Sequence, residues 1–206
     1  MAPPPSSPSR SPRRRPAAAP TGELRDGFKF RGGRLALDLP ASLAGRRRPE
    51  PTELLVDPDD LGRWLVAAGL APRAPRTTPE DVADARELRE AIYRLATSCA
   101  HRRPLAAADR ALVNRWAAHP APAPQLAADG SLTWIGGGVH ALLAAIARDA
   151  VELFGGATAA RIRACAGEGC AIGFRDSSRA GHRRWCSMAS CGNKAKVNEY
   201  RRRDRA

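Results

Sequence analysis

The sequence has few lysines, few aromatic residues and no long apolar run. Of 34 basic residues only Lys29, Lys194 and Lys196 are lysines, and aromatic residues make up 5% of the chain. The longest uncharged stretch, residues 130–147, contains four glycines and three polar residues, so it predicts a turn and a buried helix rather than a membrane span. The first twenty residues show no secretory signal, because they contain no apolar run. We therefore expect a cytoplasmic protein without a membrane segment.

The chain also lacks the patterns that carry catalysis. Its middle part has no glycine-rich phosphate loop, no paired histidines on one helix face and no serine nucleophile elbow. His101, His119 and His140 are scattered, and such isolated histidines are expected at the surface or at helix ends. We therefore expect no enzyme activity.

Acidic residues are scarce at both ends of the chain, and most of the net charge of +13 therefore lies there. Residues 1–20 hold four arginines and no acid, residues 21–160 hold 18 basic and 17 acidic groups, and residues 161–206 hold 12 basic and four acidic groups. A basic excess concentrated in one segment is typical of a protein that binds a polyanion. The Pro/Ser/Arg-rich tail, residues 1–22, is predicted to be disordered, either as a solvated tail or as an added phosphate contact.

Residues 23–157 read as a mainly helical domain. Asp57-Pro58 and Thr78-Pro79 are typical helix starts, with a capping residue before a proline. Further helices are expected over about 105–118 and from residue 139 to Gly155-Gly156, and Asp129-Gly130 predicts a hairpin turn. Residues 28–44 are compatible with a strand or a short helix. The side chains expected in the core include Trp64, Trp116, Trp134, Cys99 and Val151.

The other four cysteines lie in the basic segment, residues 158–206. Cys165 and Cys170 are separated by four residues, as are Cys186 and Cys191, with fifteen residues between the pairs. Two short-spaced pairs suit a tetrahedral Zn²⁺ ion, which takes ligands from two chain segments. Four thiolates fill the tetrahedron, so we expect one structural Zn²⁺. A disulfide pair or redox switch, another metal, and His182 as an alternative ligand remain open.

The sequence around these cysteines predicts a small treble-clef-like α+β module. The stretches AIGFRD and HRRW are expected to form a hairpin around SSRAG. Cys191 precedes KAKVNEYRRR, which predicts a helix whose first turn favours a thiolate. In that helix Val197 and Tyr200 are expected to pack inward on the hairpin and on Trp185. The predicted fold is mainly α, a helical N-terminal domain followed by this module.

The stretch RACAGEGCAIGFRDSSRAGHRRWCSMASCGNKAK resembles the CGNR-type zinc finger family of bacterial proteins. Lys194 stands where the family name places arginine. The segments GGRLALD, DPDDLGRWLVAAGL and ARELREAIYRL resemble the ABATE domain, whose family description refers to stress-induced transcription regulation. After Asp38 the chain has LPASL, residues 39–43, where that family has a Val-Asn-Thr-like stretch. The resemblance implies a zinc-binding, DNA-associated regulator.

The basic residues of the module define the partner that we expect, which is DNA bound through its phosphates. A small-molecule effector and a homodimer are compatible with the helical domain. The alternative is an RNA-binding or protein-interaction module in which zinc only braces the surface. The candidate nucleic-acid contacts are Arg183, Arg184, Asn193, Lys194, Lys196 and Arg201.

Overall fold

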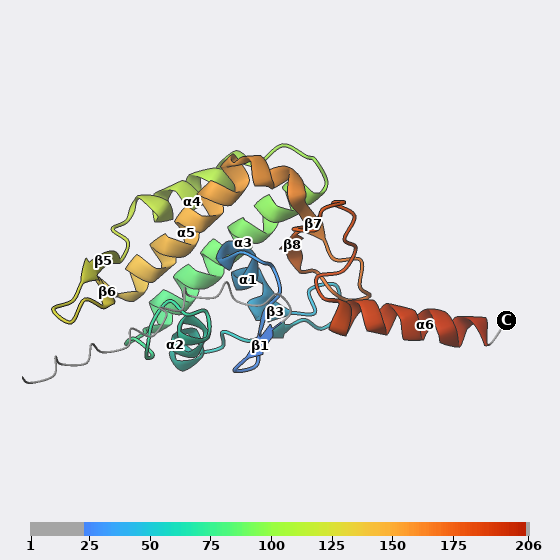
Figure 1. The fold of residues 1–206 in the computed structure, drawn as a ribbon, viewed down its shortest axis with the longest axis horizontal. Helices are drawn as coiled ribbons and strands as arrows, with labels where there is room; N and C mark the ends of the chain where they lie inside the picture. The colour runs from blue at the N-terminus through green and yellow to red at the C-terminus, as the bar shows by residue number, and fades with distance from the viewer. Residues whose placement is uncertain (1–22, 205–206) are drawn as a thin grey trace, which may run out of the picture.

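The computed structural model describes residues 23–204, and the predicted tail, residues 1–22, lies outside these described residues. Three long helices form the body of the molecule: α3 (Pro79–Ala100), α4 (Ala107–Ala118) and α5 (Val139–Gly155). They pack side by side, and the C-terminal helix α6 (Asn193–Arg203) extends away from them (Figure 1). The fold is mainly α with small two-stranded sheets, as predicted.

Residues 23–53 combine strand and helix, so both readings of the 28–44 segment hold in part. β1 (Glu23–Arg25) and β2 (Phe28–Phe30) pair antiparallel, and α1 (Leu35–Asp38) continues into the 3-10 helix η1 (Leu39–Ser42). β3 (Leu43–Ala44) then pairs antiparallel with β4 (Thr52–Glu53). The ring centroids of Phe30 and Trp64 lie 5.8 Å apart, and this contact anchors the first hairpin on the core.

The two predicted helix starts are confirmed. The Asp57 side chain accepts a hydrogen bond from the Asp60 amide at the start of α2 (Pro58–Ala67). Thr78 and Asp81 form a reciprocal capping box at the start of α3. These caps satisfy amides that the first helical turn leaves without partners, which fixes where each helix begins.

The second half of the domain follows the prediction with two corrections. The hairpin of β5 (Ala123–Leu126) and β6 (Leu132–Ile135) turns at Gly130, as expected. Trp134 was expected in the core but is 61% exposed, because this hairpin projects from the helices and no element within residues 23–204 covers it. Val151 was placed on the buried face of α5, yet it is exposed while Leu153 takes the buried position.

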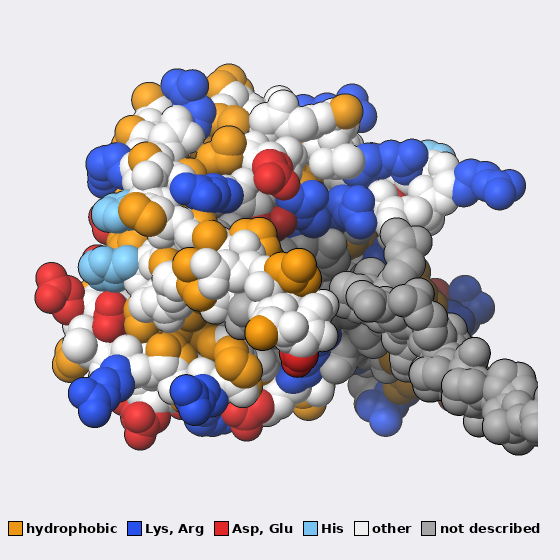
Figure 2. Space-filling model, turned by 60° about the vertical axis from the view of Figure 1, so that its left-hand side comes forward, with side chains coloured by type: hydrophobic (Ala, Val, Ile, Leu, Met, Phe, Trp, Pro, Cys, Tyr) orange, Lys and Arg blue, Asp and Glu red, His pale blue; other side chains and the backbone are white. Residues whose placement is uncertain are grey.

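One apolar core joins the helices, and it contains Leu61, Trp64, Leu88, Ile92 and Leu143. Cys99 is half-buried against this core, in agreement with a packing role. None of the helices between residues 23 and 204 combines the length and apolar character needed to cross a membrane. Figure 2 shows acidic and basic side chains interspersed on the surface of the helical domain.

The C-terminal module begins where the 3-10 helix η2 (Ala157–Arg161) leaves α5. β7 (Ile162–Ala164) pairs antiparallel with β8 (Gly173–Arg175), and Ile162 is part of the helical core. A loop follows, then a single π-helical turn, η3 (Met188–Gly192), leads into α6. The module is therefore built onto the end of α3 by its first strand.

Candidate metal centre and its basic surroundings

The four clustered cysteines come from three local structures. Cys165 and Cys170 lie in the turn that joins β7 to β8, Cys186 lies at the end of the following loop, and Cys191 lies in η3. Gly169 adopts a positive φ of 68°, and a side chain on Gly167 would approach Cys191 Sγ to 3.0 Å. The two glycines therefore allow the tight turn that presents both thiols of the first pair.

The hairpin of the module differs from the one predicted. AIGFRD supplies β8, but its partner is β7, which precedes Cys165, and residues 182–185 form no strand. Asp176 prevents the second pairing, because its carboxylate accepts hydrogen bonds from the amides of Ser178 and Arg183, each at 2.9 Å. These bonds fold residues 176–183 into a loop rather than a return strand.

Arg183 stabilises this loop from inside. Its guanidinium lies 4.8 Å from the centre of the Phe174 ring and donates hydrogen bonds to the carbonyls of Trp185 and Cys186. Phe174 is fully buried together with Cys165 and Cys186. Arg183 is a predicted nucleic-acid contact, and its Nε and Nη2 also donate within the module, which places Cys186 beside the first cysteine pair.

The four Sγ atoms have the spacing of a zinc site. Cys186 Sγ lies 3.9 Å from Cys170 Sγ and 3.8 Å from Cys191 Sγ, and all four Sγ atoms lie within 4.8 Å of one another. A tetrahedral ion with Zn–S bonds of about 2.3 Å places its sulfur atoms about 3.8 Å apart. All five cysteines of the chain are free thiols, so no disulfide competes with this arrangement.

The protonation of the thiols also calls for a cation. Hydrogen bonds from Cys170 and then from Cys186 lower the pKa of Cys165 to about 2. The backbone amides of Gly167 and Cys186 add N–H···S bonds of 3.4 and 3.3 Å to the same sulfur. The hydrogen bond with Cys165 raises the pKa of Cys170 to about 11 and also raises that of Cys186. Without a cation, Cys170 and Cys186 therefore keep their protons beside an ionised Cys165, and a metal ion supplies the positive charge that lets the thiols of the cluster ionise together.

The donor set fits one structural Zn²⁺ bound by four thiolates, which leaves no open coordination position. Among residues 23–204 this is the one group of His, Cys, Asp and Glu side chains whose ligand atoms converge in this way. His182 is exposed in the 176–186 loop and does not belong to the cluster, and Cys99 lies on α3.

Within residues 23–204, three hydrogen bonds join the metal module to the helical domain. The Arg175 amide donates to the Gly32 carbonyl at 2.8 Å, Arg31 Nη1 donates to Ser190 Oγ at 2.8 Å, and Arg47 Nη1 donates to the Cys165 carbonyl at 3.3 Å. Arg31 and Arg47 were not among the predicted site residues. No local motif marks them, because they lie more than a hundred residues from their partners.

The remaining candidate contacts lie on the surface of the module. Arg184 is exposed, with its guanidinium 5.0 Å from the centre of the Trp185 ring. Four candidates lie on α6 and are all exposed: Asn193, Lys194, Lys196 and Arg201. Val197 and Tyr200 were expected to pack inward, but they are 47% and 67% exposed, because α6 extends away from β7 and β8 (Figure 1).

Arginines also surround an open hollow of about 880 Å³ between the end of α3 and the 180–184 loop. Its lining contains no acidic residue. The basic side chains that line it are Arg102, Arg161, Arg163, His182, Arg183 and Arg184. Two candidate residues, Arg183 and Arg184, thus lie near arginines of η2 and β7 that were not among the predicted contacts.

A helical domain joined to a four-cysteine zinc module defines this molecule as a zinc-finger protein. Family models match both parts: residues 33–157 match ABATE, described as "Putative stress-induced transcription regulator", and residues 161–204 match the CGNR zinc finger. The chain belongs to the ABATE family and carries a CGNR zinc finger. No protein with a curated description matches the chain.

Proposed function

We propose that this protein is a DNA-binding transcription regulator that contacts the phosphate backbone through its zinc module. The observation that carries the proposal is α6, which extends into solvent with no buried residue and with basic side chains along its length. A helix without a fully buried residue leaves most of its surface available to a partner. The family description, which refers to transcription regulation, supports the same conclusion.

The charges on α6 are of two kinds. Arg202 and Arg203 form ion pairs with Glu199, whereas within residues 23–204 Lys194, Lys196 and Arg201 have no acidic partner. Unpaired cations on an exposed helix suit phosphate contacts, which release counterions from the DNA. Asn193, at the start of the helix, is the candidate for a contact to a base edge.

The arginine-lined hollow supplies a second surface for the same partner. It lies on the zinc module beside the 180–184 loop, and its lining has no carboxylate to repel phosphates. Zinc fixes both surfaces through one cluster, since Cys186 ends the loop and Cys191 precedes α6. The metal therefore has a structural role, because it holds the loop and α6 in position. We propose a non-enzymatic, cytoplasmic regulator whose helical domain senses an effector or dimerises.

A protein-interaction module is the second candidate, and exposed apolar residues favour it. Val197 and Tyr200 lie on α6, and Met188 in η3 is 48% exposed. Such residues are typical of a surface that another protein covers. This candidate predicts a protein partner or RNA rather than duplex DNA, with zinc bracing the surface.

The test is a titration of the zinc-loaded full chain with duplex DNA at several salt concentrations. We expect binding to weaken steeply with salt, and Lys194→Ala with Arg201→Ala to reduce the slope of log K against log salt by about 2. The matched control is Arg73→Ala with Arg76→Ala, which removes the same charge from the exposed loop between α2 and α3.

An equal loss of slope in both double variants would show that net charge, and not α6, controls binding. Absence of duplex binding at low salt, together with tight binding of single-stranded RNA or a protein, would replace the proposal with the second candidate.

A further inference from the structure

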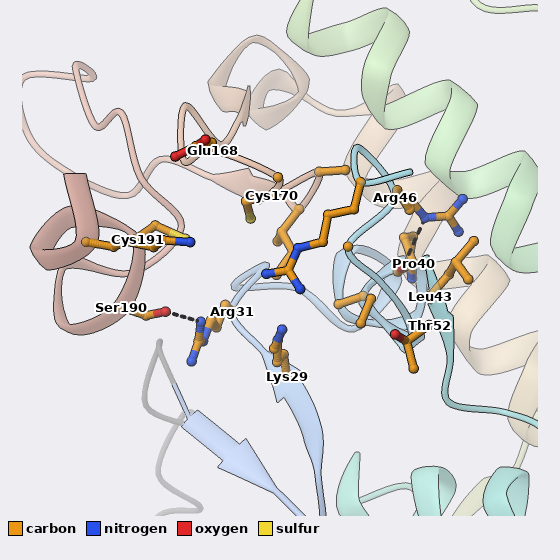
Figure 3. Close-up of a pocket in the computed structure, with 18 residues that line it drawn as sticks. Lys29, Arg31, Pro40, Leu43, Arg46, Thr52, Glu168, Cys170, Ser190 and Cys191 are labelled. Carbon is orange, nitrogen blue, oxygen red and sulfur yellow. Dashed lines mark hydrogen bonds between the residues drawn. The ribbon is translucent and has the colours of Figure 1, made fainter. Parts of the chain in front are cut away.

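A cavity of about 150 Å³ lies between the helical domain and the zinc module. Its helical-domain wall comes from β2 and from residues 40–48, and its other wall comes from residues 168–172 and 190–194 (Figure 3). The zinc ligands Cys170 and Cys191 form part of that second wall. The cavity is therefore bounded by both parts of the molecule.

Positive charge dominates the cavity. Five basic residues line it, and they are Lys29, Arg31, Arg46, Arg48 and Lys194. Arg46 is neutralised by a bidentate ion pair with Glu90 at 2.7 and 2.8 Å. Within residues 23–204 the other four have no acidic partner, and the one carboxylate in the lining, Glu168, accepts a hydrogen bond from Asn198. Figure 3 shows Lys29 pointing from β2 into the cavity.

The zinc centre accounts for only part of this charge. Four thiolates on Zn²⁺ carry two net negative charges, and nearby cations balance such a site. Four cations without acidic partners exceed that requirement. In addition, Arg31 Nε is buried and has no hydrogen-bond acceptor, although Arg31 Nη1 donates to Ser190 Oγ. A buried donor without an acceptor is uncommon and costs free energy.

The backbone holds Arg48 in the cavity. A Cβ atom on Gly45 would lie 3.0 Å from Arg48 Cδ, and one on Gly169 would lie 3.2 Å from Arg48 Nε. Both glycines have positive φ angles, 67° and 68°. The Arg48 side chain therefore lies in a gap left by one glycine of the helical domain and one glycine of the zinc module.

We propose that this cavity binds the oxyanion group of a small molecule, such as a phosphate monoester. The volume equals roughly five water molecules, which suits a phosphate group and excludes a nucleic-acid duplex. Lys29, Arg31 and Arg48 contact the oxyanion from the helical domain, and Lys194 contacts it from α6. The anion thus joins the two parts of the molecule, and its binding requires no nucleic acid.

The experiment is calorimetric titration of the zinc-loaded full chain with inorganic phosphate, at constant ionic strength and without DNA. We expect saturable binding, which Lys29→Gln with Arg48→Gln weakens about tenfold or more, since each lost partner is a charged hydrogen bond. The matched control, Arg76→Gln with Arg179→Gln, removes the same charge from exposed positions outside the cavity and should change the dissociation constant less than about twofold.

Zinc stoichiometry and circular dichroism of each variant verify folding. If the cavity double variant fails to fold, Lys194→Gln at the exposed rim replaces it and should also weaken binding. Equal weakening in the cavity and control variants, or no saturable binding to the wild type, overturns the proposal. Because no DNA is present, such a failure leaves the proposed function untouched, and a failure of DNA binding leaves this site untouched.

Discussion

The helical domain and the zinc module reach a fixed shape by different means. The helices α2 to α5 bury one apolar core around side chains such as Trp64, Leu88 and Leu143. In the described part of the module, residues 158–204, the buried cluster consists of Cys165, Phe174 and Cys186, and α6 contains no fully buried residue. So small a segment cannot bury enough apolar surface for stability, and a metal replaces the missing core.

The two parts also use their arginines differently. In the helical domain Arg89 forms an ion pair with Glu53 at 2.6 Å, Arg46 pairs with Glu90, and Arg94 pairs with Asp109. In the module Lys194, Lys196 and Arg201 have no such partner among the described residues. Arg46, Arg89 and Arg94 therefore stabilise the fold of the first part, whereas Lys194, Lys196 and Arg201 of the second part are available to a ligand or a nucleic acid.

Removal of zinc should produce the largest difference in stability between the two parts. In Cys186→Ser we expect bound zinc to fall from one ion to none, because the tetrahedral site loses one of its four thiolate ligands. The module then loses the apparent binding free energy of structural zinc, which is about 10–16 kcal/mol in small fingers. Residues from 165 onward should then lose protection against hydrogen exchange and protease, while amides of α3 and α5 keep theirs. Native mass spectrometry and hydrogen exchange measure both effects.

Cys99→Ser is the control for this experiment, because Cys99 is a free thiol packed on α3. It should retain one zinc ion and a protected module. A Cys186→Ser protein that is metal-free yet protected beyond residue 165 would refute the view that the metal holds the module.

Substitution of two tryptophans should test the helical domain, whose stability depends on its apolar core and not on zinc. Trp64 is fully buried, so Trp64→Ala should lower the free energy of unfolding of the helical domain by about 3–5 kcal/mol. Trp134 is 61% exposed, so Trp134→Ala should change it by less than about 0.5 kcal/mol. Urea unfolding of the zinc-loaded variants measures both, with zinc content unchanged. Similar costs would mean that the β5–β6 hairpin packs on the core in solution.

The helix starts and Trp134 show which features of the helical domain the sequence could predict and which it could not. Helix starts at Pro58 and Pro79 were predictable, because capping is local and each cap lies within four residues of the amides it satisfies. Periodicity also identified the buried face of α3. The error at Trp134 arises because an apolar residue in a hairpin pattern carries no information on whether another element covers it.

The zinc module also shows that local patterns are predictable from the sequence, whereas contacts between distant segments are not. Cysteine spacing predicted the cluster, since metal ligands must be near in sequence in a small module. Periodicity placed Val197 and Tyr200 on one face of α6, but it could not show that this face stays exposed in the part of the chain that the structure describes. The cavity was beyond prediction, because Lys29 and Lys194 approach it from opposite ends of the chain.

The buried carboxyl of Asp38 gives the helical domain a pH dependence of its own. Burial raises the pKa of Asp38 to about 7, against the hydrogen bond from the Gly32 amide at 2.7 Å and the charge of Arg25. The folded-state pKa exceeds the unfolded value of 3.8, so the folded protein binds this proton more tightly. The resulting stability is complete below about pH 4 and is lost as the pH rises through 7.

Asp38→Asn cannot ionise and retains an oxygen that accepts from the Gly32 amide. Its free energy of unfolding should therefore gain on that of the wild type by about 2–3 kcal/mol between pH 5 and pH 8. Urea unfolding at the two pH values measures this gain, and Asp59→Asn on the exposed side of α2 controls for the loss of one negative charge. A difference between Asp38→Asn and wild type that stays constant with pH would mean that Asp38 is already ionised in the folded protein, and that the end of α1 tolerates a buried charge.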